Sequence, residues 1–391
     1  MATDGTLTAA DLVARMVALQ PLVAARAQQA EQQRRLDDEV LAALHDSGVF
    51  RHFVPRRYGG LQLGVGDFVD IVLPLAEACA STAWVTSFLM EHNLILSLFP
   101  ERTQDEVFGS QPYVMAPGAA FPPGAAVPVE GGFLVSGRWS YASGVRHSDW
   151  AMSTVLIDGA ERPDMRWVLV PIEAVEVHDV WHVDGMAATA SDDFSMDEVF
   201  VPDHRTLRMS EMGDGTSPGA RLHAPDPTYA LPMTPFLAMT AALPILGAAK
   251  GALRLFTERL ATRVSAGTRQ SERASLHVVL GDVSAQVHVA ELLVREAAAE
   301  MVQMARAGRS GDVPARAAMR SRIAHAVACC RDAVRTMVDT GGSSLHLLDH
   351  PLQRAARDIT VASAHVIHDG LMTSELHGRV LLGLPPQTFL V

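Results

Sequence analysis

Cysteine is scarce in this chain of 391 residues, which contains three: Cys79, Cys329 and Cys330. An odd and sparse set cannot build a framework of disulfides and is typical of a reducing compartment, so we expect a cytoplasmic location. Cys329 and Cys330 are adjacent within an Ala-rich helical segment. This context favours small buried apolar side chains over a redox pair.

Long apolar runs, targeting signals and basic clusters are also missing from the sequence. No apolar run reaches the roughly 18 residues that a membrane span requires, and the N-terminus lacks the basic start and apolar core of a signal peptide. The formal net charge is −12, the pI is about 5.7, and no block of Lys or Arg stands out. We therefore expect neither a membrane nor a nucleic acid as partner.

Dinucleotide and metal motifs are absent as well. No G-x-G-x-x-G fingerprint follows a predicted strand, so direct use of NAD(P)H is not expected, and we expect no metal site. Apolar residues, in contrast, make up 48% of the chain. The length and this composition are enough for a large core and for two or three domains.

Helical periodicity dominates both ends of the chain. Apolar residues recur at helical spacing in eight segments, with a further short helix expected at the C-terminal end: 8–23, 37–46, 67–78, 81–98, 236–264, 272–307, 312–340 and 351–368. Thr8 and Ser81 are expected to cap the first and fourth helices, and Gly48 to end the second. Four long helices joined by short links predict a C-terminal bundle.

Between these helical parts, short β runs alternate with Gly and Pro. Strands are expected at five segments, which together predict a β-sandwich or small barrel: 133–135, 151–157, 166–170, 174–182 and 194–201. Residues 209–235 show little periodicity and predict a connecting loop that covers a pocket. The chain thus divides into a helical domain (1–111), a β-domain (112–208), this loop and a helical bundle (236–391).

One segment of the β-domain has an unusual composition, Gly131–Trp150, with the sequence GGFLVSGRWSYASGVRHSDW. It mixes aromatic residues with small hydroxyl residues after a Gly-Gly turn. Aromatic faces can pack on a flat ring, and small residues let backbone N–H groups approach it. The same pattern also fits an ordinary hairpin of a β-sandwich.

This segment resembles the middle β-domain of the acyl-CoA dehydrogenase superfamily. Its W-x-[YF]-A-S-G form is closer to the two-component flavin monooxygenases of that superfamily. The resemblance covers about residues 10–385 and includes four further segments: GVFRHFVPRRYGG (48–60), DEVFVP (197–202), TGGSSLHLLDHPLQRAARD (340–358) and HGRVLLG (377–383). It implies an α+β protein with an N-terminal helical domain, a middle β-sandwich or barrel and a C-terminal four-helix bundle.

The resemblance also implies a reaction. Such an oxygenase component receives reduced FMN or FAD from a separate NAD(P)H-dependent flavin reductase. It uses O₂ to hydroxylate a small aromatic, phenolic substrate through a C4a-hydroperoxyflavin. We therefore expect reduced flavin, with FMN preferred, a reductase partner and a homo-oligomer, most simply a tetramer.

The flavin ring is expected at the middle domain. By the resemblance, Ser143 lies at the N5/C4a edge of the flavin, and Tyr141 and Trp139 pack near the ring. Pro123 and Gly124 match a P-x-G-x-A loop whose backbone approaches the flavin, although Pro-Gly pairs also mark plain turns.

The phosphate side of the flavin is expected at the bundle. Arg263 matches a phosphate ligand of the superfamily, and its guanidinium fork suits phosphate; a solvated helix-end Arg fits the sequence equally well. The loop at Gly341 and Gly342 resembles one that reaches the flavin of a neighbouring subunit.

Two histidines are the candidate catalytic residues. His365 matches a His that the monooxygenases carry after their RxxRD helix, and His92 matches one that faces their flavin pocket. A neutral imidazole could accept the phenol proton as the ring attacks oxygen, so we expect His365, assisted by His92, to be the base.

Three alternatives remain open at this point. An acyl-CoA dehydrogenase needs a carboxylate, but Val366 occupies the position of its base, with Asp369 and Glu375 nearby. A monooxygenase acting on nitrogen or sulfur would need no phenol base. A non-enzymatic flavin-binding scaffold on the same fold would be expected to show a basic patch.

Overall fold

The N-terminal domain is helical, and its helices bury apolar residues along one face, except α4, which is buried almost all round. The computed structural model describes residues 7–265, 267–388 and 390–391; residues 1–6, 266 and 389 lie outside the described residues. The elements of this first domain are α1 (Ala9–Gln33), α2 (Asp38–Ser47), η1 (Val49–Arg51), η2 (Arg56–Tyr58), α3 (Val65–Ala78), α4 (Ala80–Leu96) and α5 (Glu101–Phe108).

The predicted caps of these helices are partly confirmed. Thr8 and Asp11 form a capping box at α1, and Gly48 ends α2 in the left-handed conformation. The prediction for Ser81 was wrong, because α4 begins one residue earlier with Cys79 at its N-cap. Ser81 lies inside the first turn of α4, and its hydroxyl faces the sulfur of Met186.

The middle of the chain forms one seven-stranded sheet with the strand order β5-β6-β2-β1-β3-β4-β7. All neighbouring pairs are antiparallel except β1 and β3, which are parallel. The strands are β1 (Gly118–Val129), β2 (Gly132–Ala142), β3 (Trp150–Ile157), β4 (Met165–Pro171), β5 (Glu176–His178), β6 (Asp192–Pro202) and β7 (Thr206–Arg208). The sheet encloses an apolar core of its own, with Trp139 stacked on Phe194 at 5.4 Å between ring centroids.

Two sequence predictions in this domain were wrong. Pro123 and Gly124 lie inside strand β1 and not in a loop. A Cβ on Gly124 would lie 2.3 Å from Cζ2 of Trp139, so packing in the sheet explains why a residue without a side chain stands at this position. The strand predicted at 174–182 ends at His178, because the backbone N–H groups of Val180 and Trp181 turn to the carboxylate of Asp192.

The segment 209–235 is also more ordered than the sequence suggests. It contains α6 (Met209–Gly213), α7 (Pro218–Leu222) and the 3₁₀ turn η7 (Pro227–Ala230), and the first bundle helix begins at Met233. Pro218 stands in the first turn of α7 behind the Ser217 cap. Short elements with their own caps, rather than a long loop, therefore connect the sheet to the bundle.

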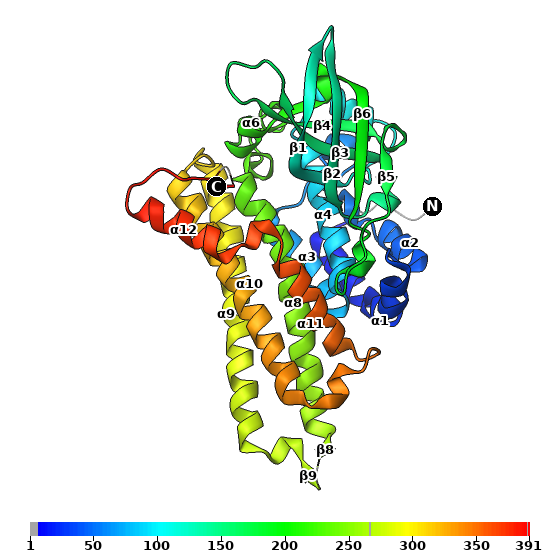
Figure 1. Ribbon diagram of the computed structural model, residues 1–391, viewed down its shortest axis with the longest axis vertical. Helices are drawn as coiled ribbons and strands as arrows, with labels where there is room; N and C mark the ends of the chain where they lie inside the picture. Colours follow the sequence, from blue (N-terminus) through cyan, green and yellow to red (C-terminus); the bar gives the residue numbers. More distant parts are fainter. Residues whose placement is uncertain (1–6, 266, 389) are drawn as a thin grey trace.

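The C-terminal bundle contains α8 (Met233–Thr262), α9 (Ala274–Arg306), α10 (Val313–Gly341), α11 (Pro351–Ser363) and α12 (Gly370–Leu381). A short hairpin, β8 (Val264–Ser265) and β9 (Thr268–Arg269), joins α8 to α9. The helix predicted at 351–368 ends earlier, at Ser363, and the 3₁₀ turn η10 (Val366–His368) follows it. Figure 1 shows the sheet beside the upper part of α8, with the bundle extending away from it.

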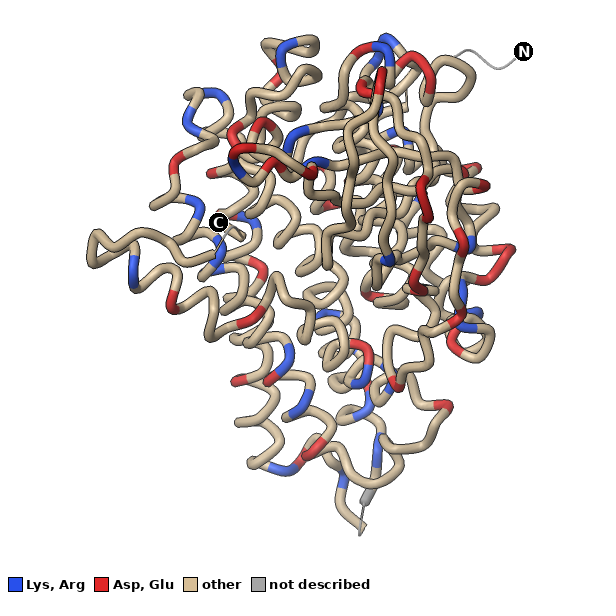
Figure 2. Tube along the Cα trace, turned by 45° about the horizontal axis from the view of Figure 1, so that its top comes forward, with Lys and Arg blue, Asp and Glu red and all other residues tan. Residues whose placement is uncertain are grey.

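Two helices, α8 and α9, are long and apolar enough to cross a membrane by length and composition alone. The most apolar window of α8 is 83% buried inside the protein, which is the environment of a core helix, whereas that of α9 is 22% buried. Figure 2 shows Lys and Arg scattered among Asp and Glu along the described chain. A mixed surface of this kind gives little support to a nucleic-acid partner.

Candidate active site

Three parts of the fold meet at one face of α4. Trp84, Phe88 and His92 are spaced four residues apart and therefore follow one another along that face. The Trp84 ring lies 4.8 Å from Phe88, and Phe88 lies 5.8 Å from His92, centroid to centroid. Trp84 also lies 5.8 Å from His365, which stands just before η10 in the bundle. The structure thus brings both predicted catalytic histidines to one aromatic wall.

Ser143 faces the same wall from the end of β2. The indole Nε1 of Trp84 donates to Oγ of Ser143 at 3.0 Å. Ser143 Oγ lies 2.8 Å from Oγ of Ser191, which lies 2.6 Å from Oγ1 of Thr189. Thr189 in turn donates to the carbonyl of Met186 at 2.8 Å. All five residues of this hydrogen-bonded chain, which we call the hydroxyl chain, are buried.

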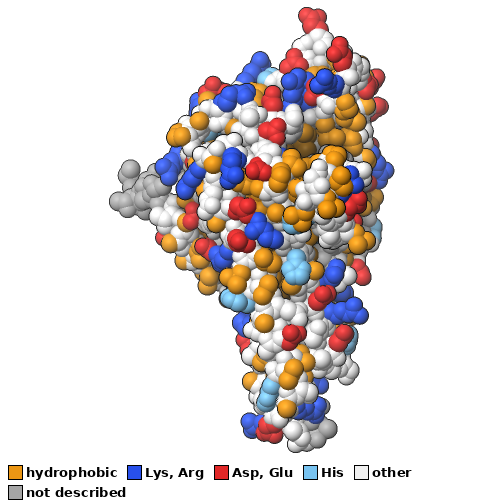
Figure 3. Space-filling view, turned by 90° about the vertical axis from the view of Figure 1, so that its left-hand side faces the viewer, with side chains coloured by type: hydrophobic (Ala, Val, Ile, Leu, Met, Phe, Trp, Pro, Cys, Tyr) orange, Lys and Arg blue, Asp and Glu red, His pale blue; other side chains and the backbone are white. Residues whose placement is uncertain are grey.

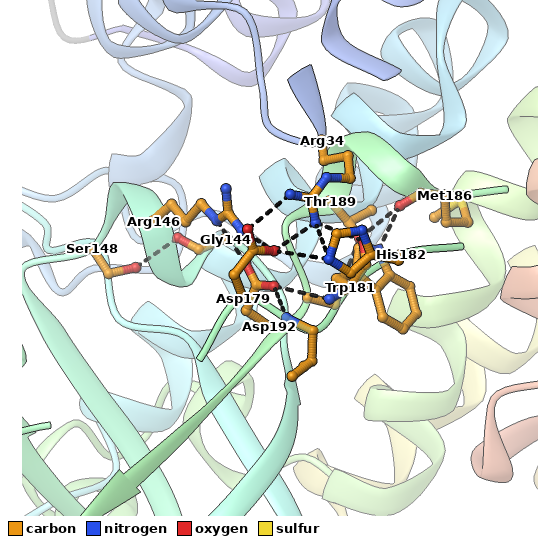
Figure 4. Close-up of polar contacts among 12 residues, drawn as sticks. Arg34, Gly144, Arg146, Ser148, Asp179, Trp181, His182, Met186, Thr189 and Asp192 are labelled. Atoms are coloured by element: carbon orange, nitrogen blue, oxygen red, sulfur yellow. Dashed lines mark hydrogen bonds and ion pairs between the residues drawn. The ribbon is translucent and has the colours of Figure 1, made fainter. Parts of the chain in front are cut away.

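An ion-pair cluster holds the segment between β5 and β6 that carries Ser191 (Figure 4). Both nitrogens of the Arg34 fork bind the carboxylate of Asp179, at 2.6 and 2.8 Å. Arg146 binds Asp192 at 2.6 Å and Asp179 at 2.9 Å. The hydrogen bond from Arg34 is the main cause that lowers the pKa of Asp179, so this carboxylate stays charged. Because Arg34 belongs to the end of α1, the cluster ties the sheet to the N-terminal domain.

The bundle holds the same segment from the other side. The buried carboxylate of Asp358 in α11 accepts the Met186 N–H at 2.6 Å. A Cβ on Gly185 would lie 2.4 Å from the Arg357 carbonyl, so the segment lies directly against the Arg-Asp pair of the RxxRD motif. Burial raises the pKa of Asp358 to about 6. The motif therefore positions the hydroxyl chain through Met186.

Tyr141 and Trp139 have opposite environments. Tyr141 has a left-handed backbone (φ 67°), is 65% exposed and meets Trp181 edge to face at 5.9 Å. Trp139 is fully buried in the sheet, and its Nε1 donates to the Thr154 carbonyl. Only Tyr141 can offer its ring to a bound molecule. The structure thus places the Trp139 indole, which the sequence suggested for the flavin ring, in the core of the sheet.

His365 is held in one tautomer. Its Nδ1 accepts the backbone N–H of Ile367, which fixes the start of η10. A neutral imidazole carries one hydrogen, so this hydrogen lies on Nε2. Burial lowers the pKa of His365 to about 4, and the charge of Arg320 acts in the same direction. Arg320 itself donates to the Ile367 carbonyl at 2.8 Å and so holds the turn.

His368, at the end of η10, was not a candidate from the sequence. It is buried, neither ring nitrogen has a hydrogen-bond partner among the described residues, and its ring lies 6.4 Å from that of His365. Burial lowers its pKa to about 3, and the charge of Arg320 acts in the same direction. A buried imidazole without a partner is a group that can bind a ligand.

His92 presents a free nitrogen. Its Nδ1 is buried without a partner among the described residues, whereas a Cβ on Gly118 would lie 3.0 Å from its Nε2. Burial lowers the pKa of His92 to about 4, and the nearby Ala116 carbonyl opposes this shift. Nε2 thus faces the segment 116–118, and Nδ1 is the ring nitrogen left without a partner among the described residues.

The neighbouring acid Glu91 is buried beside this histidine. Its Oε2 has no partner among the described residues, and Thr240 of α8 is the polar group that faces it. Burial raises the pKa of Glu91 well above its ordinary value. Burial therefore favours the neutral acid form of this side chain.

Arg263, Gly341 and Gly342 lie at the other end of the bundle. Arg263 ends α8 and donates to the hydroxyl of Ser344, next to the two glycines at the end of α10. Along α8, about 21 residues separate Arg263 from Ala241 beside His368, which corresponds to about 30 Å. A single chain therefore does not place these residues around the same ring as Ser143.

The carboxylates that a dehydrogenase would need after the RxxRD motif are not positioned for it. Val366 is half exposed, and Asp369 caps α12 by accepting the N–H groups of Leu371 and Met372. Glu375 lies on the exposed side of α12. The geometry offers no base there, which agrees with the reading from the sequence.

Several residues of the site escaped the sequence analysis. Ser191 and Thr189 occupy a short segment without periodicity, and their partner Ser143 lies about 50 residues away, so no local pattern connects them. Trp84 lies in the segment 81–98, which the sequence predicted only as a helix. Its donor N–H was the available signal, because a buried indole N–H normally has an acceptor.

The arrangement can hold a flat ring. An exposed aromatic face at Tyr141, a tight turn at Ser143 and a wall of Trp84 and Phe88 surround polar groups that are neutral at pH 7. Such surroundings suit a flavin, whose chemistry depends on hydrogen bonds to its ring nitrogens and on the exclusion of water.

Comparisons with known proteins agree with this geometry. The family models "Acyl-CoA dehydrogenase, N-terminal domain" and "Acyl-CoA dehydrogenase, C-terminal domain" match residues 9–104 and 239–370. The chain is 36% identical to a pigment production hydroxylase of Rhodococcus sp., over 97% of this chain and 98% of the relative. It is 32% identical to the oxygenase component of the FADH2-dependent resorcinol hydroxylase of Rhizobium sp., over 96% and 95%.

A solved structure shows the same arrangement over the whole chain. The HsaA monooxygenase from M. tuberculosis superposes with a TM-score of 0.92 at 31% identity, covering 98% of this chain and 100% of that one. The chain therefore belongs to the acyl-CoA dehydrogenase superfamily, among the flavin-dependent monooxygenases that act as oxygenase components and use reduced flavin and O₂.

Proposed function

We propose that this oxygenase component hydroxylates a small phenolic substrate bound against the wall of Trp84 and Phe88. The observation that carries the proposal is the pair of neutral histidines, His92 and His365, at the two ends of this wall. The resorcinol hydroxylase relative supports a phenol, since its name specifies a phenolic substrate. A substrate oxidised at nitrogen or sulfur would not need two such groups beside its ring.

The two histidines have different parts in this proposal. Nδ1 of His92 has no partner among the described residues, and we assign it as the acceptor of the phenol proton. Nε2 of His365 carries hydrogen and donates to the phenol oxygen, which stabilises developing negative charge there. The sequence had favoured His365 as the base. We assign the base to His92 instead, because the contact with Ile367 keeps the hydrogen of His365 on Nε2. Such a base contributes about 10²–10⁴-fold to the rate.

Reduced flavin, when bound, supplies the electrons and the position at which O₂ is activated. Ser143 would face the N5 edge of the ring, and Tyr141 would lie beside it. Trp84 and Phe88 keep water from the reacting groups, which limits loss of oxygen as hydrogen peroxide. The Rhizobium relative is named for FADH2, and this favours FAD over the FMN that the sequence suggested.

The remaining partners follow from the two-component class. The chain would receive its flavin from a separate NAD(P)H-dependent reductase in the cytoplasm. A homo-oligomer, most simply a tetramer, would let Arg263, Gly341 and Gly342 of one subunit reach the flavin of another. Exposed leucines on α12 support subunit contacts: Leu371, Leu381 and Leu382. Figure 3 shows hydrophobic side chains gathered on the wide part of the molecule's α12 side.

The test is to supply FADH2 or FMNH2 from an independent reductase and to offer a panel of phenols. Formation of a product 16 mass units heavier, dependent on both reductase and O₂, is the expected result. Oxidation of NADH by the isolated chain and flavin, without a reductase, would contradict it. A chain that is reduced by acyl-CoA instead would be a dehydrogenase, and Glu91→Gln would then abolish that reduction.

A further inference from the structure

The hydroxyl chain has one direction only. The Trp84 indole has a hydrogen and no lone pair to offer, so it must donate to Ser143. The Met186 carbonyl has no hydrogen, so Thr189 must donate to it. A hydroxyl has one hydrogen, and Thr189 therefore accepts from Ser191, which in turn accepts from Ser143. The hydrogen of Ser143 is thus committed to Ser191.

This direction makes Ser143 an acceptor toward anything that binds beside it. Its oxygen has two lone pairs, of which one accepts from Trp84, and the other is free. Ser143 is also the most exposed member of the hydroxyl chain, at 9%, whereas Ser191 is 4% and Thr189 1% exposed. A bound group can therefore reach Ser143, and it gains a hydrogen bond only if it is a donor.

The backbone around the hydroxyl chain is built to keep this arrangement. Met186 and Ala190 are non-glycine residues with left-handed backbones, φ 57° and 46°. Such conformations persist where surrounding contacts hold them, and Asp358 and the Trp181 indole both bind Met186. Thr189 and Ser191 therefore do not turn away to release the hydrogen of Ser143.

We propose that Ser191 and Thr189 are positioning residues that make the site select reduced over oxidised flavin. Reduced flavin carries a hydrogen on N5, whereas oxidised flavin has a lone pair there. Because Ser143 can only accept, it forms a hydrogen bond with reduced flavin and disfavours oxidised flavin. The inference rests on the proposed function, which places the N5 edge of the flavin at Ser143.

Removal of Ser191 should release this selection. In Ser191→Ala the hydrogen of Ser143 becomes free to turn toward the flavin, so the oxidised ring also gains a hydrogen bond. We expect the ratio of Kd for oxidised flavin to Kd for reduced flavin to fall about 10-fold. A 10-fold change corresponds to about 30 mV in the two-electron potential of the bound flavin. Binding of the reduced form should change less than 3-fold.

The experiment measures both Kd values anaerobically, with FAD and with FMN, and the potential of the bound flavin. Thr189→Val is a second variant of nearly the same shape; it removes the acceptor of Ser191, which can then donate to Ser143. Ser195→Ala is the matched control, since Ser195 lies on strand β6, which begins directly after Ser191, and binds His178 instead. The control should leave the ratio unchanged.

The outcomes distinguish a failure of the inference about Ser191 and Thr189 from a failure of the proposed function. A lower ratio in Ser191→Ala and Thr189→Val, but not in Ser195→Ala, supports the inference; if Ser191→Ala does not fold, Thr189→Val decides. An unchanged ratio in folded variants overturns it, even when Ser143→Ala weakens the binding of reduced flavin. Failure of the unmodified chain to bind reduced flavin would instead contradict the proposed function.

Discussion

Nδ1 of His365 lies 3.2 Å from the backbone nitrogen of Ile367 and accepts its hydrogen. This contact caps the turn η10 and also decides which nitrogen of the ring faces the site as a donor. We predict that His365→Ala lowers the hydroxylation rate about 10²-fold. His365→Gln, which can place an amide N–H near the position of Nε2, should recover a large part of that loss.

Stopped-flow measurement of the hydroxylation step, with flavin binding as the control, tests this prediction. Both variants should bind reduced flavin as the unmodified chain does. Equal rates in His365→Gln and His365→Ala would show that donation from Nε2 has no importance.

His92→Ala should affect the same step for a different reason. Loss of the Nδ1 acceptor leaves the phenol proton in place, so the rate should fall about 10²-fold at neutral pH. Because a phenol has a pKa near 10, raising the pH supplies phenolate and should partly restore the rate. The His365 variants should show no such recovery. A pH-independent defect in His92→Ala would remove His92 as the base.

Gly118→Ala should disturb His92 without removing it. The new Cβ would lie 3.0 Å from Nε2 and 3.2 Å from Cε1 of the ring, so the ring must move by a few tenths of an ångström. Small misplacements of a catalytic group are costly, and we expect roughly a 10-fold lower rate. Gly281→Ala on α9 is the control, because no atom lies within 4 Å of its Cβ position. That variant should keep full activity.

Stability should fall in acid because His92 and His368 are buried, and His365 is half-buried, as neutral rings. Their folded pKa values, about 4, 4 and 3, lie below the ordinary 6.5. Between the folded pKa values and 6.5, the unfolded chain therefore binds more protons than the folded chain. Each histidine's contribution is complete above pH 6.5 and is lost as the pH falls to its folded pKa, by about 1.4 kcal/mol per pH unit.

Denaturant unfolding of His368→Leu from pH 7.5 to pH 5 measures this effect. The variant should lose less stability than the unmodified chain over that range. His288→Leu, at an exposed position on α9, should follow the unmodified chain. Parallel curves for His368→Leu and the unmodified chain would contradict the burial of a neutral ring.

The exposed leucines of α12 should contribute to assembly. Light scattering of the unmodified chain is expected to give a homo-oligomer, most simply a tetramer. Leu381→Asp together with Leu382→Asp, at side chains that are 74% and 78% exposed, should reduce the particle size. The same change at Val17 on α1 is the control. A monomer that still binds reduced flavin tightly would refute the prediction.

Periodicity, turn residues and composition were sufficient to predict most of the fold. Helical spacing of apolar residues located most of α1–α4 and the bundle, and alternation of β runs with Gly and Pro located the sheet. These signals are local, because each depends on neighbours within one or two turns or on one strand. The predictions failed where a distant group decided the conformation, as Asp192 does for the end of β5.

The site follows the same division. The family resemblance in the sequence named His92, Ser143 and His365 as candidates, and it also named Trp139 and Gly124 as cofactor contacts. Only the tertiary structure showed that Trp139 lies in the core, and that its ring leaves no room for a side chain at Gly124. The direction of the hydroxyl chain likewise depends on donors and acceptors that are far apart in sequence. The tautomer of His365 depends on the conformation of the turn η10. Hydrogen bonds join groups that meet in space, and the sequence alone does not state where they meet.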